Sequence, residues 1–113
     1  MKIYHNPRCS KSRQTLGLLI DNDVDPEIFE YLKTPPTVNE LSDLIKMLGI
    51  KPFDLVRKGE AIYKEKYKGK ELTDEAWIKA MVENPKLIER PIVIDGNRAR
   101  LGRPPDRVLE LLD

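Results

Sequence analysis

The chain has 113 residues, of which 40% are hydrophobic and 35% charged, the size and composition of one compact domain over residues 1–113. Its 20 basic and 19 acidic residues leave a net charge of +1, so no general positive field favours nucleic acid as a partner. No apolar run approaches the roughly 20 residues of a membrane span, and residues 1–7 lack the apolar stretch of a secretory signal. We therefore expect a cytoplasmic monomer.

The chain holds a single cysteine, Cys9, and a single histidine, His5. One cysteine cannot form an intramolecular disulfide. Metal and haem sites bring several His, Cys or carboxylate ligands together, so we predict neither a bound metal nor a bound cofactor. Redox chemistry at Cys9 then requires a second sulfur from outside the chain.

The first third of the chain predicts a β-α-β unit. Residues 2–4 are a short strand-like segment, and a turn leads from them to Cys9. Apolar residues then recur at helical spacing until the polar residues 21–23 end the helix. Residues 26–31 predict a second strand. Cys9 therefore directly precedes the N-terminus of a helix.

The middle of the chain is predicted to be helical. Residues 37–40 match a capping box, and the amphipathic helix that follows is closed by Gly49. Residues 53–57 predict one more short helix, whereas residues 58–70 are rich in lysine and predict an exposed connection whose conformation the sequence leaves open. A further helix is expected over residues 73–84.

The C-terminal part predicts a hairpin and a last helix. Residues 92–94 form a buried type of strand, residues 95–96 signal a turn, and residues 98–101 return as the partner strand. Residues 104–105 then open the helix. The whole order predicts an α/β fold, a thioredoxin-like mixed sheet with flanking helices and a helical insertion between the β-α-β and β-β-α halves. The last helix carries the apolar residues Val108, Leu109, Leu111 and Leu112.

Two interpretations of Cys9 stay open from its position: a reactive thiolate at a helix N-terminus, and a small buried cysteine with no reactive role. A helix N-terminus stabilises a thiolate through its unpaired N–H groups and the positive end of its dipole. The hydroxyl of Ser12 can add a hydrogen bond. The free amides of Ser10, Lys11 and Ser12 also make a pocket for a tetrahedral oxyanion. Three basic side chains lie close in the sequence: Arg8, Lys11 and Arg13.

Residues 4–13, Tyr-His-Asn-Pro-Arg-Cys-Ser-Lys-Ser-Arg, closely resemble the active-site motif of the ArsC-type, glutaredoxin-dependent arsenate reductases. Further landmarks follow in that family's order: residues 31–36, residues 55–58, residues 90–93 and residues 101–104. The resemblance covers nearly the whole chain. It implies a thioredoxin-like fold with an added helical part, and an oxidoreductase.

The resemblance also implies roles for particular residues. In that family one cysteine attacks arsenate and three arginines hold the oxyanion and its products. Carried over by motif, the nucleophile is Cys9 and the arginines are Arg57, Arg90 and Arg103. The rigid donor fork of arginine suits an oxyanion, and three such charges also lower the pKa of a neighbouring thiol. Arg103 has three rivals close in the sequence: Arg98, Arg100 and Arg107.

Two further positions match the family. His5 falls where a histidine tunes the pKa of the thiol, and as the only histidine it could stay partly charged near Cys9. The alternative is a histidine that only stabilises the turn. Pro91 falls where the family has a cis proline beside the active cysteine.

The function implied by the resemblance is reduction of arsenate to arsenite through a thiol-arsenate adduct on Cys9, with glutathione as co-substrate and glutaredoxin as partner. Two alternatives stay open. One is a glutathione-dependent thiol/disulfide oxidoreductase that does not act on arsenate; the other is an Spx-like transcription regulator that binds RNA polymerase. The spacing Cys9-x-x-Ser12 counts against the regulator, which commonly has a second cysteine there.

Two departures from the family keep the first alternative open. The chain ends at Asp113, without the C-terminal extension of the longer arsenate reductases, and Gly102 stands where some of them have a cysteine.

Overall fold

The computed structural model describes residues 1–112 and divides the chain into two compact units. The first, here called the sheet unit, contains Met1–Thr34 and the chain from Arg90 onward. The second, the helical unit, is Pro35–Glu89. The helical unit is therefore an insertion between the two halves of the sheet unit, as predicted. That residues 1–113 act as one domain stays a prediction.

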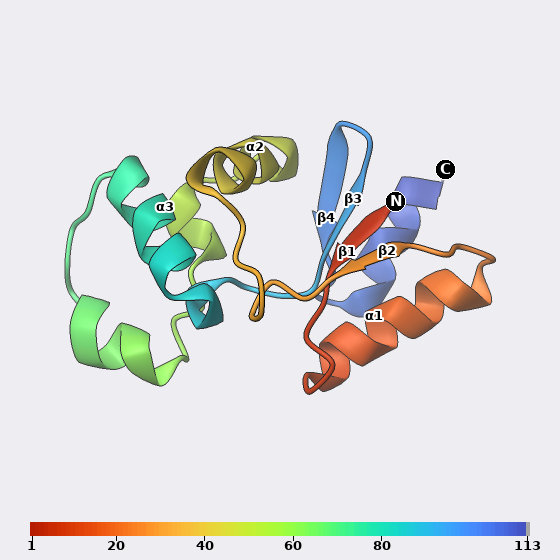
Figure 1. Ribbon diagram of the computed structural model, residues 1–113, viewed down its shortest axis with the longest axis horizontal. Helices are drawn as coiled ribbons and strands as arrows, with labels where there is room; N and C mark the ends of the chain where they lie inside the picture. The colour runs from red at the N-terminus through yellow and green to blue at the C-terminus, as the bar shows by residue number, and fades with distance from the viewer. Residues whose placement is uncertain (113) are drawn as a thin grey trace. The chain divides into compact units, whose positions relative to one another are not determined.

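The sheet unit contains a four-stranded mixed sheet in the order β2-β1-β3-β4 (Figure 1). Strands β1 and β2 are parallel, Ile3 facing Ile28, and the other two pairings are antiparallel. This is the predicted thioredoxin-like α/β arrangement. The elements of the unit are β1 (Lys2–Tyr4), α1 (Ser10–Asp21), β2 (Glu27–Phe29), β3 (Ile92–Asp95), β4 (Arg98–Leu101) and the 3-10 helix η4 (Pro105–Leu112).

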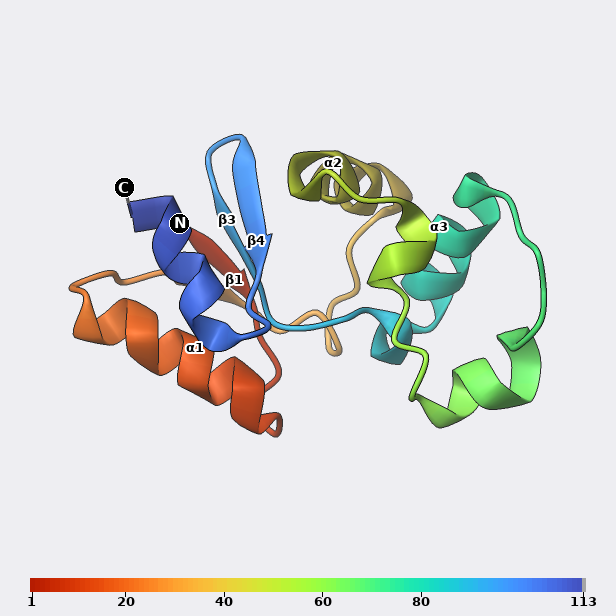
Figure 2. The same ribbon diagram turned by 180° about the vertical axis from the view of Figure 1, so that it is seen from behind.

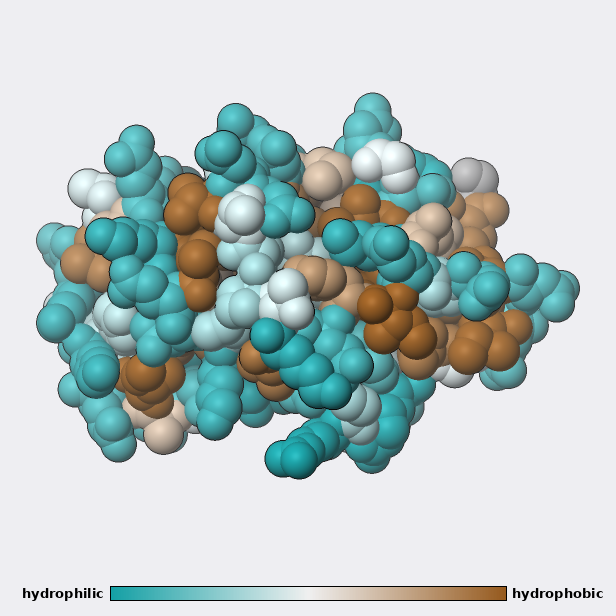
Figure 3. All heavy atoms as spheres, in the orientation of Figure 1, coloured by the Kyte–Doolittle hydropathy of each residue, from teal (hydrophilic) through white to brown (hydrophobic). Residues whose placement is uncertain are grey.

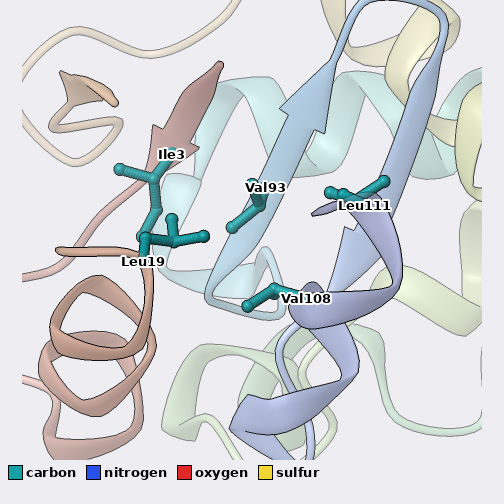
Figure 4. Close-up of a cluster of buried hydrophobic side chains, with 5 residues drawn as sticks. All are labelled: Ile3, Leu19, Val93, Val108 and Leu111. Carbon is teal, nitrogen blue, oxygen red and sulfur yellow. The ribbon is translucent and has the colours of Figure 1, made fainter. Parts of the chain in front are cut away.

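The core of the sheet unit lies between the sheet and two helical segments, α1 and η4. These segments contact each other, and η4 also contacts β4 (Figure 2). Figure 4 shows apolar side chains from the strands meeting side chains from both helical segments. The buried cluster consists of Ile3, Leu19, Val93, Val108 and Leu111, none more than 2% exposed.

Two elements of the sheet unit differ from their predictions. The second strand is shorter than residues 26–31, because the Glu30 carbonyl accepts hydrogen bonds from the N–H groups of Lys33 and Thr34 and so forms a turn. The last helix is a 3-10 helix, in which residues three apart lie on one side. Val108 and Leu111 are therefore buried, while Leu112 is exposed.

The helical unit begins as the sequence predicts. The Thr37 hydroxyl accepts a hydrogen bond from the Glu40 N–H, and the Glu40 carboxylate accepts one from the Thr37 N–H, so the capping box is confirmed. Gly49 closes the helix with φ of +70°. The elements of the unit are α2 (Val38–Leu48), η1 (Pro52–Leu55), η2 (Tyr63–Tyr67), α3 (Asp74–Glu83) and η3 (Pro85–Leu87).

Residues 58–70 contain more structure than the predicted exposed connection. Residues Tyr63–Tyr67 form a π-helical turn, and Tyr63 is buried. The ring centroids of Tyr63 and Tyr67 lie 6.4 and 5.9 Å from that of Trp77 in α3, and that of Phe53 lies 5.0 Å away. Most of residues 58–70 are exposed, as predicted, and the conformation that the sequence left open involves two tyrosines that pack on a tryptophan distant in sequence.

Hydrophilic side chains cover most of the face seen in Figure 3, with apolar side chains in scattered groups. Scattered exposed apolar residues are ordinary on a protein surface. Within residues 1–112, no helix has both the length and the apolar character to cross a membrane. The large apolar side chains that are exposed are Ile20, Ile28, Leu32, Val38, Phe53 and Leu112.

Candidate active site

Cys9 is the N-cap residue of α1, at the end of the loop that follows β1. Its backbone is extended, with φ −96° and ψ 123°. The Cys9 N–H donates to the Asn6 carbonyl at 3.0 Å, and the Cys9 carbonyl accepts the first helical hydrogen bond, from the Arg13 N–H, at 3.0 Å. The half-buried free thiol is thus carried at the positive end of the helix dipole.

The surroundings of Cys9 favour the thiolate. Burial raises the pKa of the Cys9 thiol. The backbone N–H of Ser12 and the charge of Arg90 lower this pKa, and the N–H of Lys11 and a hydrogen bond from the Arg90 side chain lower it further. The net pKa lies below the ordinary value for cysteine. A thiol with a lowered pKa is a stronger candidate nucleophile at neutral pH.

Two of the three predicted arginines lie together in the sheet unit. The Arg103 Nε atom donates to the Arg90 carbonyl at 2.8 Å. The Gly102 N–H donates to the Pro91 carbonyl at 2.8 Å, so the segments on either side of the β3-β4 hairpin are joined twice. The Arg90–Pro91 peptide bond is cis, as the resemblance implied. Arg103 therefore lies beside Arg90, and the guanidinium group of Arg90 lowers the pKa of Cys9.

Two of the three rivals of Arg103, Arg98 and Arg100, have other partners. An Arg98 guanidinium nitrogen donates to the Leu111 carbonyl at 3.0 Å. Arg100 Nε donates to the Glu110 carboxylate at 2.8 Å. Both arginines tie the hairpin to η4, whereas Arg103 is the one bound to Arg90. The sequence could not distinguish them, because all are arginines within a few positions of each other.

His5 and Ser12 are both buried and bind each other. The His5 Nδ1 atom and the Ser12 Oγ atom are 2.7 Å apart, and the same hydroxyl accepts from the Asn6 N–H at 3.0 Å. Burial lowers the pKa of His5, the nearby Glu30 raises it and Arg13 lowers it, and the net pKa is lowered. This favours neutral imidazole at pH 7, against the expectation of a partly charged side chain. A role for His5 in tuning the thiol stays a prediction.

Two kinds of group lower the pKa of the Cys9 thiol: backbone N–H groups of α1 and the side chain of Arg90. Ser12 lowers the thiol pKa through its N–H, while its hydroxyl holds the loop. The Arg13 guanidinium donates to the Pro7 carbonyl at 2.9 Å, and the Arg8 N–H donates to the Asn6 side chain at 3.0 Å. Ser10 and Lys11 begin α1 with exposed side chains. Amides and one arginine, rather than the neighbouring basic side chains, act on Cys9.

Arg57, the third predicted arginine, belongs to the helical unit. Its guanidinium lies 3.3 Å from the Glu60 carboxylate, and its N–H donates to the Leu87 carbonyl at 2.6 Å. Its assignment to the oxyanion site stays a prediction.

The groups around Cys9 suit an anion rather than a cation. They are backbone N–H groups and the guanidinium group of Arg90, and both kinds of group bind oxyanions. Among the residues that the structure describes, no three His, Cys, Asp or Glu side chains converge as a metal-binding group.

Residues 4–111 match the model of the ArsC family. The chain belongs to the ArsC family. The uncharacterized protein YfgD from Escherichia coli is 54% identical over 99% of this chain and 96% of its own. The arsenate reductase from Haemophilus influenzae is 46% identical over 97% of each chain. The arsenate reductase from Vibrio cholerae, whose structure is solved, is 50% identical in sequence to this chain. The structural match covers 96% of this chain and 94% of that chain, with a TM-score of 0.93.

In this ArsC-family chain, the sequence did not predict that Thr15 lies beside the active-site segment. The structure also explains why a glycine occupies position 102. A Cβ atom on Gly102 would lie 2.8 Å from both Pro91 Cγ and Thr15 Oγ1, so neighbouring side chains would have to shift. Thr15 is fully buried, and its hydroxyl donates to the Lys11 carbonyl at 2.9 Å. Gly102 therefore lets the segment before Arg103 lie directly against the first turns of α1. No sequence signal pointed to Thr15.

Proposed function

We propose that this protein is an oxidoreductase that reduces arsenate to arsenite, with Cys9 as the nucleophile. The observation that carries the proposal is the position of Cys9 as the N-cap residue of α1, where the amides of α1 and Arg90 act on its thiol. Relatives from Haemophilus influenzae and Vibrio cholerae have the name arsenate reductase. A thiolate flanked by anion-binding groups is the arrangement that attack on an oxyanion requires.

The proposed oxyanion site uses both backbone and side chains. The N–H groups of Ser10, Lys11 and Ser12 lie in the first turn of α1, where they can donate to oxyanion oxygens. Arg90 and Arg103 supply guanidinium groups from the sheet unit, and Arg57 completes the predicted set. Arginine can bind two oxygens at once, so these residues hold the substrate while its charge changes.

The proposed reaction begins when the Cys9 thiolate attacks arsenic. A sulfur-arsenic bond forms, one arsenic-oxygen bond breaks, and the released oxygen takes up protons from the solvent and leaves as water. Glutathione then attacks the adduct, and glutaredoxin resolves the resulting intermediate by thiol exchange. Over the cycle two thiols become one disulfide and supply two electrons. Arsenic passes from the +5 to the +3 state and leaves as arsenite.

The external thiols follow from the cysteine count. Cys9 is the only cysteine, so the second sulfur of the disulfide must come from another molecule. We propose glutathione as co-substrate and glutaredoxin as partner, with no bound cofactor. The reaction is proposed for a monomer in the cytoplasm, where a free thiol stays reduced.

The test is a coupled assay with arsenate, glutathione, glutaredoxin, glutathione reductase and NADPH. We expect arsenate-dependent NADPH consumption that disappears in Cys9→Ser. Omission of glutaredoxin or glutathione tests the two donors separately. Undiminished turnover by Cys9→Ser would contradict the nucleophile, and no turnover by the native protein would contradict arsenate as substrate.

A second candidate is thiol/disulfide exchange without arsenate. It is favoured by the same lowered pKa, because a reactive thiolate needs no oxyanion to attack a disulfide. Under this alternative, the protein accelerates reduction of a glutathione mixed disulfide in a Cys9-dependent manner and consumes no NADPH with arsenate.

A further inference from the structure

A pocket of about 220 Å³ opens in the sheet unit beside the loop that carries Cys9. Residues 5–8 line one side, and residues that follow β2 line the other. Because Arg8 directly precedes Cys9, their Cα atoms are about 3.8 Å apart. A ligand in this pocket therefore lies within a few bond lengths of the segment that bears the thiol.

Charges of both signs line the pocket. The Glu30 carboxylate lies 3.5 Å from Lys33 Nζ, and Leu32 adds an apolar wall. Arg8 is exposed on the other side, and within residues 1–112 its guanidinium has neither a salt bridge nor a hydrogen bond. Such a pocket suits a small molecule that carries both an ammonium and a carboxylate group.

We propose that this pocket binds the amino-carboxylate end of the thiol co-substrate, a zwitterionic peptide thiol of the glutathione type. Glu30 accepts hydrogen bonds from the ammonium group, and Arg8 and Lys33 donate to the carboxylate. The inference rests on the proposed function, because it concerns the thiol that reacts at Cys9.

The Glu30-Lys33 pair leaves room for this ligand. Its members are three residues apart, and the Lys33 side chain is 77% exposed. Exposed ion pairs of this kind contribute little free energy, so a ligand ammonium group can replace Lys33 beside Glu30. Lys33 is then released to bind the carboxylate.

The test uses disulfide exchange and needs no arsenate. The Cys9 thiolate attacks glutathione disulfide, the original sulfur-sulfur bond breaks, a Cys9-glutathione disulfide forms, and one glutathione thiolate leaves. The rate is followed by mass spectrometry, in parallel with bis(2-hydroxyethyl) disulfide, which carries no charged group. Glu30→Gln and Arg8→Ala should each slow the glutathione reaction about three- to tenfold, the loss of one charge-assisted hydrogen bond at an exposed site.

The neutral disulfide separates recognition from thiol reactivity. Both variants should react with it at the native rate, and the control variants Glu27→Gln and Arg107→Ala, which lie outside the pocket, should react natively with both disulfides. Equal slowing with both reagents, or no slowing with either, overturns the proposal.

The proposed function is judged separately. Absence of arsenate turnover refutes the reductase and leaves the selectivity between the two disulfides as the test of the pocket. If arsenate is reduced and the pocket variants keep the native KM for glutathione, the pocket proposal is wrong and the reductase stands.

Discussion

The two units of the chain differ in whether their residues act on the thiol of Cys9. The sheet unit has an aliphatic core beneath a site of charged and polar groups, including Cys9 and Arg90. The helical unit also buries aliphatic residues, such as Leu44 and Leu87, and it gathers aromatic rings around Trp77. Every group that the structure shows acting on the thiol pKa belongs to the sheet unit. Thiol activation is therefore a property of the sheet unit, and the helical unit contributes a predicted site residue only through Arg57.

The sharpest way to break this comparison is to disrupt the aromatic cluster. Trp77 is 3% exposed, and Trp77→Ala removes the ring on which three others pack. We expect the free energy of unfolding to fall by about 3–5 kcal/mol, measured by urea denaturation with circular dichroism. In the fraction that stays folded, the alkylation pKa of Cys9 should not change. A large shift of that pKa would show that the helical unit takes part in activating the thiol.

The second prediction concerns the sheet unit and removes the charge of Arg90 beside the thiol. Arg90→Ala should raise the pKa of Cys9, because the guanidinium both attracts the thiolate and donates to it. We also expect arsenate turnover to fall about a hundredfold, as for loss of one donor to a reacting oxyanion. The pH dependence of iodoacetamide alkylation measures the first effect. Arg107→Ala is the matched control, and an unchanged pKa in Arg90→Ala would remove Arg90 from the site.

Substitution of Arg57 tests whether the helical unit contributes to substrate binding. If Arg57 binds the oxyanion, Arg57→Ala should raise the KM for arsenate about tenfold, the loss of one charge-assisted hydrogen bond. The pKa of Cys9 should stay unchanged, because Arg57 is not among the groups that lower it. Glu60→Gln, which removes the partner of Arg57, is the control for the ion pair. A native KM in Arg57→Ala would confine the oxyanion site to the sheet unit.

A smaller effect is expected at the capping box of the helical unit. Thr37→Ala removes the hydroxyl that accepts from the Glu40 N–H. The free energy of unfolding should fall by about 1 kcal/mol, with no change in Cys9 alkylation. Thr37→Ser keeps the hydroxyl and should restore most of the loss; equal destabilisation by both variants would contradict the capping role.

The smallest effect is a dependence of stability on pH. Because the pKa of Cys9 is lower in the folded than in the unfolded chain, the thiolate favours the folded state. This contribution is complete above the unfolded pKa and is lost as the pH falls through the folded pKa. The native protein should thus gain stability relative to Cys9→Ser as the pH rises through this window. A difference that stays constant with pH would contradict the lowered pKa.

Local chemistry explains which elements were predictable. Turn residues separate the strands of the sheet unit, and the helix over 38–48 has both its capping box and its closing glycine. Short-range patterns were therefore sufficient to predict that these elements exist. The π-helical turn at Tyr63–Tyr67 was missed because its rings pack on Trp77, a contact between distant positions. The last helix was expected, but its 3-10 geometry, in which Val108 and Leu111 join the buried cluster, was not predicted.

The candidate site divides in the same way. The position of Cys9 before a helix, and hence the help from nearby amides, follows from residues adjacent in the chain. The neutral preference of His5 does not, because burial causes it. The choice of Arg103 over Arg98 and Arg100 depends on which carbonyl or carboxylate each one reaches.

The sequence by itself determined the order of elements, the single thiol at a helix N-terminus and the family resemblance, because each depends on residue types at short spacing. Only the tertiary structure brought Arg90 to Cys9 and placed Thr15 against Gly102, residues that are 81 and 87 positions apart in the chain. Such contacts depend on how strands and helices pack, and packing is not encoded in the periodicity of any one segment.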